Sequence, residues 1–235
     1  MRNTFSTTLR AAAALTVASV CVFSPVANAQ TVGAVTHLSG TLTARNDAGA
    51  TRLLATRSGI LPGETLSTAQ DTYARVKFND GTEIVIRPES RFKIEQYSYD
   101  EKKPEGDNMV FNLLKGGLRS ISGLVSKRNK DKIQYLTPTA TVGIRGTHFG
   151  MVVCDGDCAA LKDGLHVDVS AGAVAITTSA GTQQFDAGQF GYVANATTVP
   201  VIVPPNQGFK VTLPPSVTGP SGNTVGGSGA DICRP

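Results

Sequence analysis

The sequence predicts an all-β domain built from many short strands. Apolar and polar residues alternate with a period of two along most segments between residues 30 and 196. Turn-forming residues separate these segments, since the chain holds 25 Gly and 12 Pro. No segment shows a sustained 3.6-residue period bounded by helix caps. Such alternation is typical of half-buried antiparallel strands, and it suits a sandwich, a jelly roll or a β-helical stack.

The strands are expected in chain order wherever the alternation is clearest. These segments are residues 73–78, 82–87, 91–96, 132–137, 165–170 and 174–176. Asp80 and Gly81 lie between the first two segments, and Asp-Gly between alternating runs is a strong hairpin signal. Residues 100–108 are polar and charged, so we expect a solvated loop there.

The N-terminal segment has the pattern of a secretory signal peptide. Arg2 and Arg10 accompany an apolar run over residues 11–23, and an Ala-x-Ala sequence ends at Ala29. We therefore expect cleavage between Ala29 and Gln30, followed by residence in the periplasm or secretion. The apolar run is too short for a membrane anchor.

Charge and hydropathy narrow the classes of partner. Residues 1–29 contain two basic residues and no acidic ones, so 20 basic and 18 acidic residues remain after cleavage. A nearly neutral chain without a concentrated basic patch does not suit nucleic-acid binding. The processed chain offers no uninterrupted run of 18 apolar residues, so we expect no transmembrane helix in it.

Two cysteines flank a short acidic turn, Cys154-Asp155-Gly156-Asp157-Cys158. In an oxidising compartment this spacing predicts a disulfide across a hairpin tip. A redox-active pair, a zinc site with His148 and His166, and a calcium site that includes Asp163 are weaker alternatives. We therefore expect no metal and no cofactor. Cys233 is left unpaired, as a free thiol or as part of an intermolecular bridge.

The composition changes near residue 198. Residues 200–235 hold seven Pro and six Gly, with few large apolar side chains. We therefore divide the chain into a signal peptide (1–29), a β domain (30–197) and a Pro/Gly-rich tail (198–235). The composition favours an unstructured tail. The alternative is a strap that lies along the domain through Phe209, Val211 and Leu213.

Five short motifs occur in an order that resembles the FecR periplasmic domain. Together they cover about residues 59–150, with a looser continuation to about residue 195. The motifs are Gly63-Glu64-Thr65-Leu66-Ser67-Thr68, Phe78-Asn79-Asp80-Gly81-Thr82, Pro88-Glu89-Ser90, Gly116-Gly117-Leu118-Arg119-Ser120-Ile121-Ser122-Gly123, and Thr137-Pro138-Thr139-Ala140-Thr141-Val142-Gly143-Ile144-Arg145-Gly146-Thr147-His148-Phe149.

The resemblance implies an all-β periplasmic domain. The best-known members of the family are anti-sigma regulators, which carry a cytoplasmic segment and a membrane helix and sense an outer-membrane transporter. A cleavable signal peptide in this chain would replace that anchor. The resemblance therefore implies a free-standing periplasmic binding module.

The last motif contains residues with readable structural roles. Pro138 lacks an N–H group and fits the start or edge of a strand. Gly143 and Gly146 would avoid a clash in a tight stack of strands. Arg145 lies in an apolar strand, so we expect a buried guanidinium paired with carbonyls and an acid. Thr147 completes the signature.

Three classes of function remain open. The favoured class is a non-enzymatic interaction or signalling module that binds an unknown envelope protein, with strand addition at a sheet edge as one route. The second is binding of envelope polysaccharide or peptidoglycan, against which the absence of Trp counts. The third is an enzyme with paired carboxylates. Its only candidates, Glu83, Glu89 and Glu95, are neighbours in sequence alone.

Overall fold

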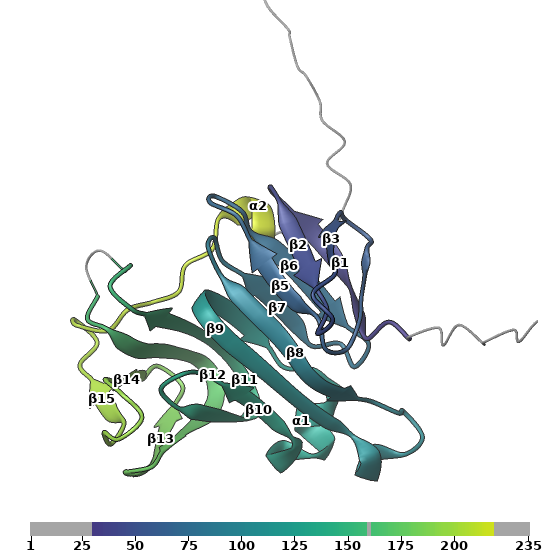
Figure 1. The fold of residues 1–235 in the computed structure, drawn as a ribbon. Helices are drawn as coiled ribbons and strands as arrows, with labels where there is room; N and C mark the ends of the chain where they lie inside the picture. Colours follow the sequence, from purple (N-terminus) through teal and green to yellow (C-terminus); the bar gives the residue numbers. More distant parts are fainter. Residues whose placement is uncertain (1–29, 159–160, 219–235) are drawn as a thin grey trace, which may run out of the picture.

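A computed structural model describes residues 30–158 and 161–218 and confirms the all-β prediction. Its strands join in one continuous 15-stranded sheet (Figure 1). The predicted cleavage site and Cys233 lie outside the described residues or at their limit. The strands of the first half are β1 (Gly33–Leu38), β2 (Leu42–Arg45), β3 (Thr51–Leu54), β4 (Gly59–Ile60), β5 (Thr65–Thr68), β6 (Ala74–Phe78), β7 (Glu83–Ile86) and β8 (Arg91–Ser98).

Three strands of the second half are 14 or 15 residues long, and only the last of them contains segments that the sequence pattern predicts. They are β9 (Asn108–Ile121), β11 (Thr141–Cys154) and β12 (Gly164–Thr178). The segments expected at 165–170 and 174–176 are therefore two halves of one strand. The shorter strands are β10 (Ile133–Leu136), β13 (Gly181–Asp186), β14 (Phe190–Val193) and β15 (Val201–Val203). Two short helices, α1 (Leu124–Arg128) and α2 (Pro215–Thr218), complete the order.

The long strands bend, and their halves join two different layers. Layer A has the order β3, β2, β5, β8, first half of β9, β10, first half of β11, second half of β12, β13. Layer B has the order β4, β1, β6, β7, second half of β9, second half of β11, first half of β12, β14, β15. Strands that pass from one layer to the other at bends or bulges are typical of sandwich-like packing.

Glycines make the bends possible. Gly146 and Gly172 have φ angles of 61° and 73°, which side chains disfavour. A Cβ atom on Gly172 would lie 2.2 Å from the carbonyl oxygen of Gly146. The register between β11 and β12 shifts at this point, between Arg145 and His148. The crowding expected at Gly143 is not found, because a Cβ atom there would meet only the Ala175 oxygen, at 3.8 Å.

The two layers share one hydrophobic core. Phe78 of layer B packs 5.0 Å, centroid to centroid, from Phe111 of layer A. Tyr135 of layer A packs edge-on against Phe149 of layer B at 5.2 Å. The Tyr135 hydroxyl also lies 2.7 Å from Ser120 Oγ. Because only the β9–β10 pairing is parallel among the described strands, the layers form a sandwich rather than a β-helix.

The predicted Asp80-Gly81 hairpin joins β6 and β7. Gly81 has a φ of 87°, and Asp80 is buried. The Asp80 carboxylate accepts hydrogen bonds from the backbone N–H and hydroxyl of Thr82, at 3.0 and 2.7 Å. Its carbonyl oxygen accepts the Leu124 N–H at the start of α1. Asp80 therefore fixes both the turn and the helix beside it.

The loop at residues 100–108 is mostly exposed, as predicted, but one of its residues is anchored in the protein. Asp107 is buried, and its carboxylate pairs with Arg128 at 3.0 Å. Its other oxygen accepts the N–H of Asp100. The loop is thus tied to the C-terminal end of α1.

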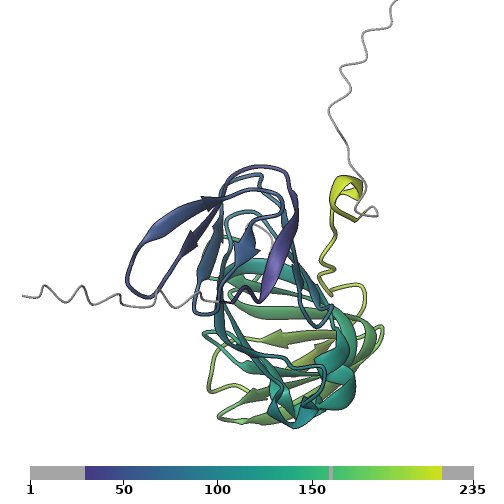
Figure 2. The same ribbon diagram turned by 90° about the vertical axis from the view of Figure 1, so that its right-hand side faces the viewer.

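The region beyond residue 197 is also more ordered than its composition suggests. Residues 201–203 form β15, and residues 208–218, which we call the strap, run from there to α2 beside layer B (Figures 1 and 2). Val211 and Val217 are buried, and Phe209 packs against the same cluster as Val211. Over residues 208–218 the strap alternative is therefore the one observed, whereas residues 219–235 of the predicted tail lie outside the described residues. Within the described residues, neither helix is long and apolar enough to span a bilayer.

Candidate functional site

One row of outward-facing residues crosses layer B and forms a track for the strap. Register partners on neighbouring strands place six residues side by side: Arg75, Val85, Arg119, Gly150, Asp168 and Phe190. The strap passes along this row. Gly208 lies against the ring of Phe190, Val211 lies over Gly150, and Val217 lies at Arg75.

The centre of the row holds the backbone of Val211. Asp168 Oδ1 accepts the Val211 N–H at 3.1 Å, and Arg119 Nη1 donates to the Val211 carbonyl oxygen at 2.7 Å. Gly150 leaves the necessary space, because a Cβ atom there would lie 2.5 Å from the Val211 Cβ. We call Arg119, Asp168 and Gly150 the clasp.

Arg119 is the organising cation of this face. Its side chain is 13% exposed and contacts Asp168 Oδ2 at 3.3 Å. It also donates to the hydroxyl of Ser170 and, through Nε, to His148 Nε2 at 2.7 Å. Burial lowers the pKa of His148, and the nearby positive charge of Arg119 lowers it further. A neutral His148 can accept this hydrogen bond, whereas an imidazolium cannot.

A second arginine holds the far end of the strap. Arg75 is buried, and its Nη2 donates to the carbonyl oxygen of Val217 in α2. Both arginines therefore bind main-chain atoms rather than side chains of the strap. Such contacts fix the path of a chain without demanding particular side chains along it.

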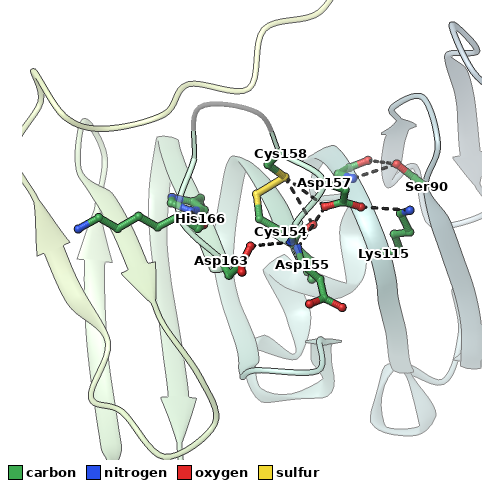
Figure 3. The surroundings of a disulfide bond; sticks show 12 residues. Ser90, Lys115, Cys154, Asp155, Asp157, Cys158, Asp163 and His166 are labelled. Carbon is green, nitrogen blue, oxygen red and sulfur yellow. Dashed lines mark hydrogen bonds and ion pairs between the residues drawn. A yellow bond between two sulfur atoms is a disulfide. The ribbon is translucent and has the colours of Figure 1, made fainter.

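The disulfide lies at the end of β11 (Figure 3). Cys154 and Cys158 are bonded, with a Cα–Cα distance of 5.4 Å, as predicted. Asp157 Oδ1 accepts the Asp155 N–H, and its other oxygen pairs with Lys115 Nζ at 3.1 Å. The hydrogen bond from Asp155 and the charge of Lys115 both lower the pKa of Asp157.

The acidic residues of this hairpin are engaged with the protein itself. Asp163 Oδ1 accepts the Gly156 N–H at 2.6 Å, on the opposite side of the turn from Lys115. Among residues 30–158 and 161–218, no three His, Cys, Asp or Glu side chains converge as a metal site would need. The two histidines considered as zinc ligands have other partners. His148 accepts a hydrogen bond from Arg119, and His166 Nε2 lies 2.8 Å from the Lys162 oxygen.

A cavity of about 440 Å³ adjoins the hairpin and the strap. Arg87, Gly117 and Val152 form part of its lining, and Phe209 of the strap and Leu161 close to the hairpin form another part. The guanidinium carbon of Arg87 lies 5.7 Å from the centre of the Phe209 ring. The cavity therefore combines a cationic group with apolar walls.

The residues of the last family motif lie in different structural environments. Pro138 lies in the turn between β10 and β11, where the Thr137 hydroxyl accepts the Ala140 N–H at 2.9 Å. Thr147 is buried, and its N–H donates to Ser122 Oγ at 2.9 Å. Gly146 is exposed, so its positive φ rather than crowding favours glycine.

Arg145 contradicts the expectation of a buried, paired guanidinium. It is exposed, and its guanidinium makes no hydrogen bond or ion pair with any described residue. The reason is its position on the outer face of layer A, away from the track on layer B. Arg119, rather than Arg145, is the buried arginine that pairs with carbonyls and an acid. The sequence signal for it is the G-x-x-R spacing of Gly116 and Arg119.

Comparison with known protein families locates one domain within the chain. A model described as FecR protein matches residues 64–175. The chain contains a FecR domain. This FecR domain runs from β5 into β12 and includes Arg75, the clasp and the disulfide. Phe190 and the strap lie outside it. No curated protein sequence matches the chain.

Solved structures show weaker likenesses to the FecR-domain chain. Two crystal structures of a candidate anti-sigma factor from Parabacteroides distasonis match with a TM-score of 0.45 each, at 13% and 14% identity. Each match covers 59% of this chain and 58% of the other. A third structure, described as a cell surface anchoring domain, has a TM-score of 0.26 and 32% identity over 26% of this chain and 82% of the other.

Proposed function

We propose that this protein is a non-enzymatic interaction and signalling module of the cell envelope, which works in the periplasm or outside the cell after export. The FecR domain supports the signalling role. The signal-peptide pattern before Gln30 supports export. The buried polar groups of layer B give no support to a catalytic role, because Arg75, Arg119 and Asp168 are bonded to the protein's own backbone.

The observation that carries the interaction role is the free edge of β13. This strand ends layer A, and within the described part of the chain it pairs only with β12. It spans six residues, Gly181–Asp186, with neither Pro nor Lys. The other strands that end a layer, β3, β4 and β15, span four, two and three residues. A long edge without such protection is suited to pairing with a strand of a partner.

In-cell cross-linking of the tagged full-length protein tests the interaction role. We expect one envelope protein to be captured reproducibly, and Gln184→Lys to reduce its capture, because a lysine on the edge opposes strand addition. Gln184 is exposed in β13. The control is Gln70→Lys, which introduces the same charge at an exposed turn away from β13. Capture of glycan fragments alone, or equal capture by both variants, would contradict the proposal.

The export step is tested separately. The mass of the protein recovered from the periplasm or the medium should correspond to a chain that begins at Gln30. Ala29→Asp should block this processing, because the cleavage site needs a small residue there. An unprocessed, cytoplasmic wild-type protein would contradict export.

A further inference from the structure

The cavity beside the strap contains an arginine, Arg87, that has no acidic partner among the described residues. Arg87 Nε is buried without a hydrogen-bond acceptor among the described residues. Its guanidinium forms no ion pair within residues 30–158 and 161–218. Burying a charged donor without a partner is costly. The ring of Phe209 compensates only in part, through a contact at 5.7 Å.

The other charged groups of the cavity do not neutralise Arg87. Lys115 and Asp157 are paired with each other at 3.1 Å. Glu89 is exposed to solvent at the rim, where its charge remains hydrated. Among the residues that the structure describes, Arg87 is therefore the cation of this cavity that lacks an acidic partner.

The floor of the cavity holds Arg87 in place. A Cβ atom on Gly117 would lie 2.9 Å from Val152 and 3.1 Å from the Arg87 Cδ, so glycine lets the arginine stem lie against the sheet. The Ser90 hydroxyl accepts the Gly117 N–H at 2.9 Å and donates to the Gly117 or Pro88 oxygen. Ser90 and Lys115 lie together beside the disulfide hairpin in Figure 3. The site is thus built on bonded strands rather than on a loop.

We propose that this cavity binds a carboxylate attached to an apolar group. The planar guanidinium of Arg87 matches a carboxylate in two parallel hydrogen bonds. Val152, Leu161 and Phe209 surround the apolar part of the ligand. The volume of about 440 Å³ is in the range of sites for small ligands. This site is separate from the β13 edge, so it does not depend on the proposed interaction role.

Calorimetric titration of the mature chain, residues 30–235, tests the proposal with three probes. They are 3-phenylpropanoate, N-acetyl-Gly-Phe with a free carboxylate, and the same peptide as its C-terminal amide. We expect the free acids to bind at least about tenfold more tightly than the amide, because a charged hydrogen-bonded pair is lost in the amide. Binding of both acids identifies a general carboxylate site, whereas binding of the peptide acid alone identifies a site for a chain terminus.

Substitution of the arginine separates the site from non-specific attraction. Arg87→Gln should weaken binding of the free acid at least about tenfold, and Arg87→Lys should weaken it less. Arg45→Gln, at an exposed position in β2, is the matched control and should bind as the wild type does. Melting temperatures confirm that each variant folds, and the acid-to-amide comparison needs no variant. No binding of any probe, or equal binding of acid and amide, would overturn the proposal.

Discussion

At the scale of single residues, the feature that stands out is a pair of side chains that binds both polar groups of one strap residue. Arg119 and Asp168 bond to the carbonyl and the N–H of Val211, and to each other. The Asp168 side chain is only 3% exposed, so these partners take the place of water as its hydrogen-bond donors. Removing one member of a buried pair leaves the other uncompensated, which is more damaging than the loss of a surface contact.

The first prediction compares Asp168 with Arg145, the residue for which the sequence predicts a buried structural role. Asp168→Ala should lower the free energy of unfolding by about 3 kcal/mol, because it leaves Arg119 without its acidic partner and the Val211 N–H without an acceptor. Arg145→Ala should change it by less than about 0.5 kcal/mol, because Arg145 is exposed and unpaired among the described residues. Urea-induced unfolding measures both. Equal losses would mean that Arg145 has a structural partner outside the described residues.

The second prediction concerns His148. Its pKa is lowered from 6.5 in the folded protein, chiefly by burial and then by Arg119, while Asp168 opposes the shift. The unfolded chain therefore takes up the proton first as the pH falls. The stabilisation by neutral His148 is complete above about pH 6.5 and is lost progressively below it.

Unfolding free energies measured between pH 5 and 8 check this dependence. The wild type should lose more stability on acidification than His148→Gln, which keeps an acceptor for Arg119 but does not titrate. Parallel pH profiles for the two proteins would assign the acid sensitivity to other groups.

At the scale of elements, the strap and the disulfide hairpin each depend on one local structural feature. The strap needs a glycine beneath it at residue 150, where a Cβ atom would also lie 2.3 Å from Asp168 Oδ1. The hairpin needs a bridge between cysteines four residues apart. Both demands can be tested without disturbing the core.

The third prediction is that Gly150→Ala loosens the strap. The added methyl group occupies the space of Val211 and Asp168, so backbone amides at 208–213 should exchange hydrogen at least about tenfold faster. The matched control is Gly143→Ala, whose Cβ meets only an oxygen at 3.8 Å and which should leave the strap protected. If the strap amides exchange at the same rate in the two variants, the clasp does not determine how firmly the strap is held.

The fourth prediction concerns the disulfide. Because the bridge closes a very short loop, the chain-entropy model limits its stabilisation to about 2 kcal/mol. The double substitution Cys154→Ser and Cys158→Ser should lower stability by that amount or less, and reduction of the wild type should have the same effect. Thermal unfolding with and without a thiol reductant measures the difference. Complete loss of folding would show that the bridge does more than close the turn.

At the scale of the whole molecule, the two layers cannot be separated into units. The strands β9, β11 and β12 each contribute one half to layer A and the other half to layer B. The aromatic rings of both layers meet in the same core. Unfolding of either layer would therefore disrupt strands that also belong to the other layer.

The fifth prediction is therefore a single cooperative unfolding transition for the β domain. Far-ultraviolet circular dichroism, which reports the strands, and tyrosine fluorescence, which reports the five tyrosines including Tyr135 in the core, should give coincident curves in urea. Two separated transitions would show that the layers fold independently.

The sequence pattern predicted the class of fold and the positions of β6, β7, β8, β10 and β12, because burial on one side of a strand produces alternation that is visible locally. The bend at Gly172 was less visible, because a bulge interrupts the period and makes one strand resemble two. The track on layer B could not be predicted, because Arg75, Arg119 and Asp168 come from separate strands whose register is set by long-range pairing.

The site was predictable in unequal parts. The disulfide follows from two cysteines around an Asp-Gly-Asp turn, and the spacing is a local feature. Arg119 and Arg145 both lie in family motifs, and Arg145 has the stronger local signal of a structural role because it interrupts an apolar run. Which arginine is buried depends on which face the strap covers. A strap rich in Pro and Gly has a composition like that of an unstructured tail.

The order of contacts along the strap determines how the protein responds to tension. A load applied to the chain beyond residue 218 first reaches the Arg75 contact at Val217, then the clasp at Val211, and only then β15. Each contact engages one or two hydrogen bonds, so they give way one after another rather than together. The strap can peel from the sheet while every core strand stays paired, and the two arginines set the force at which each step occurs.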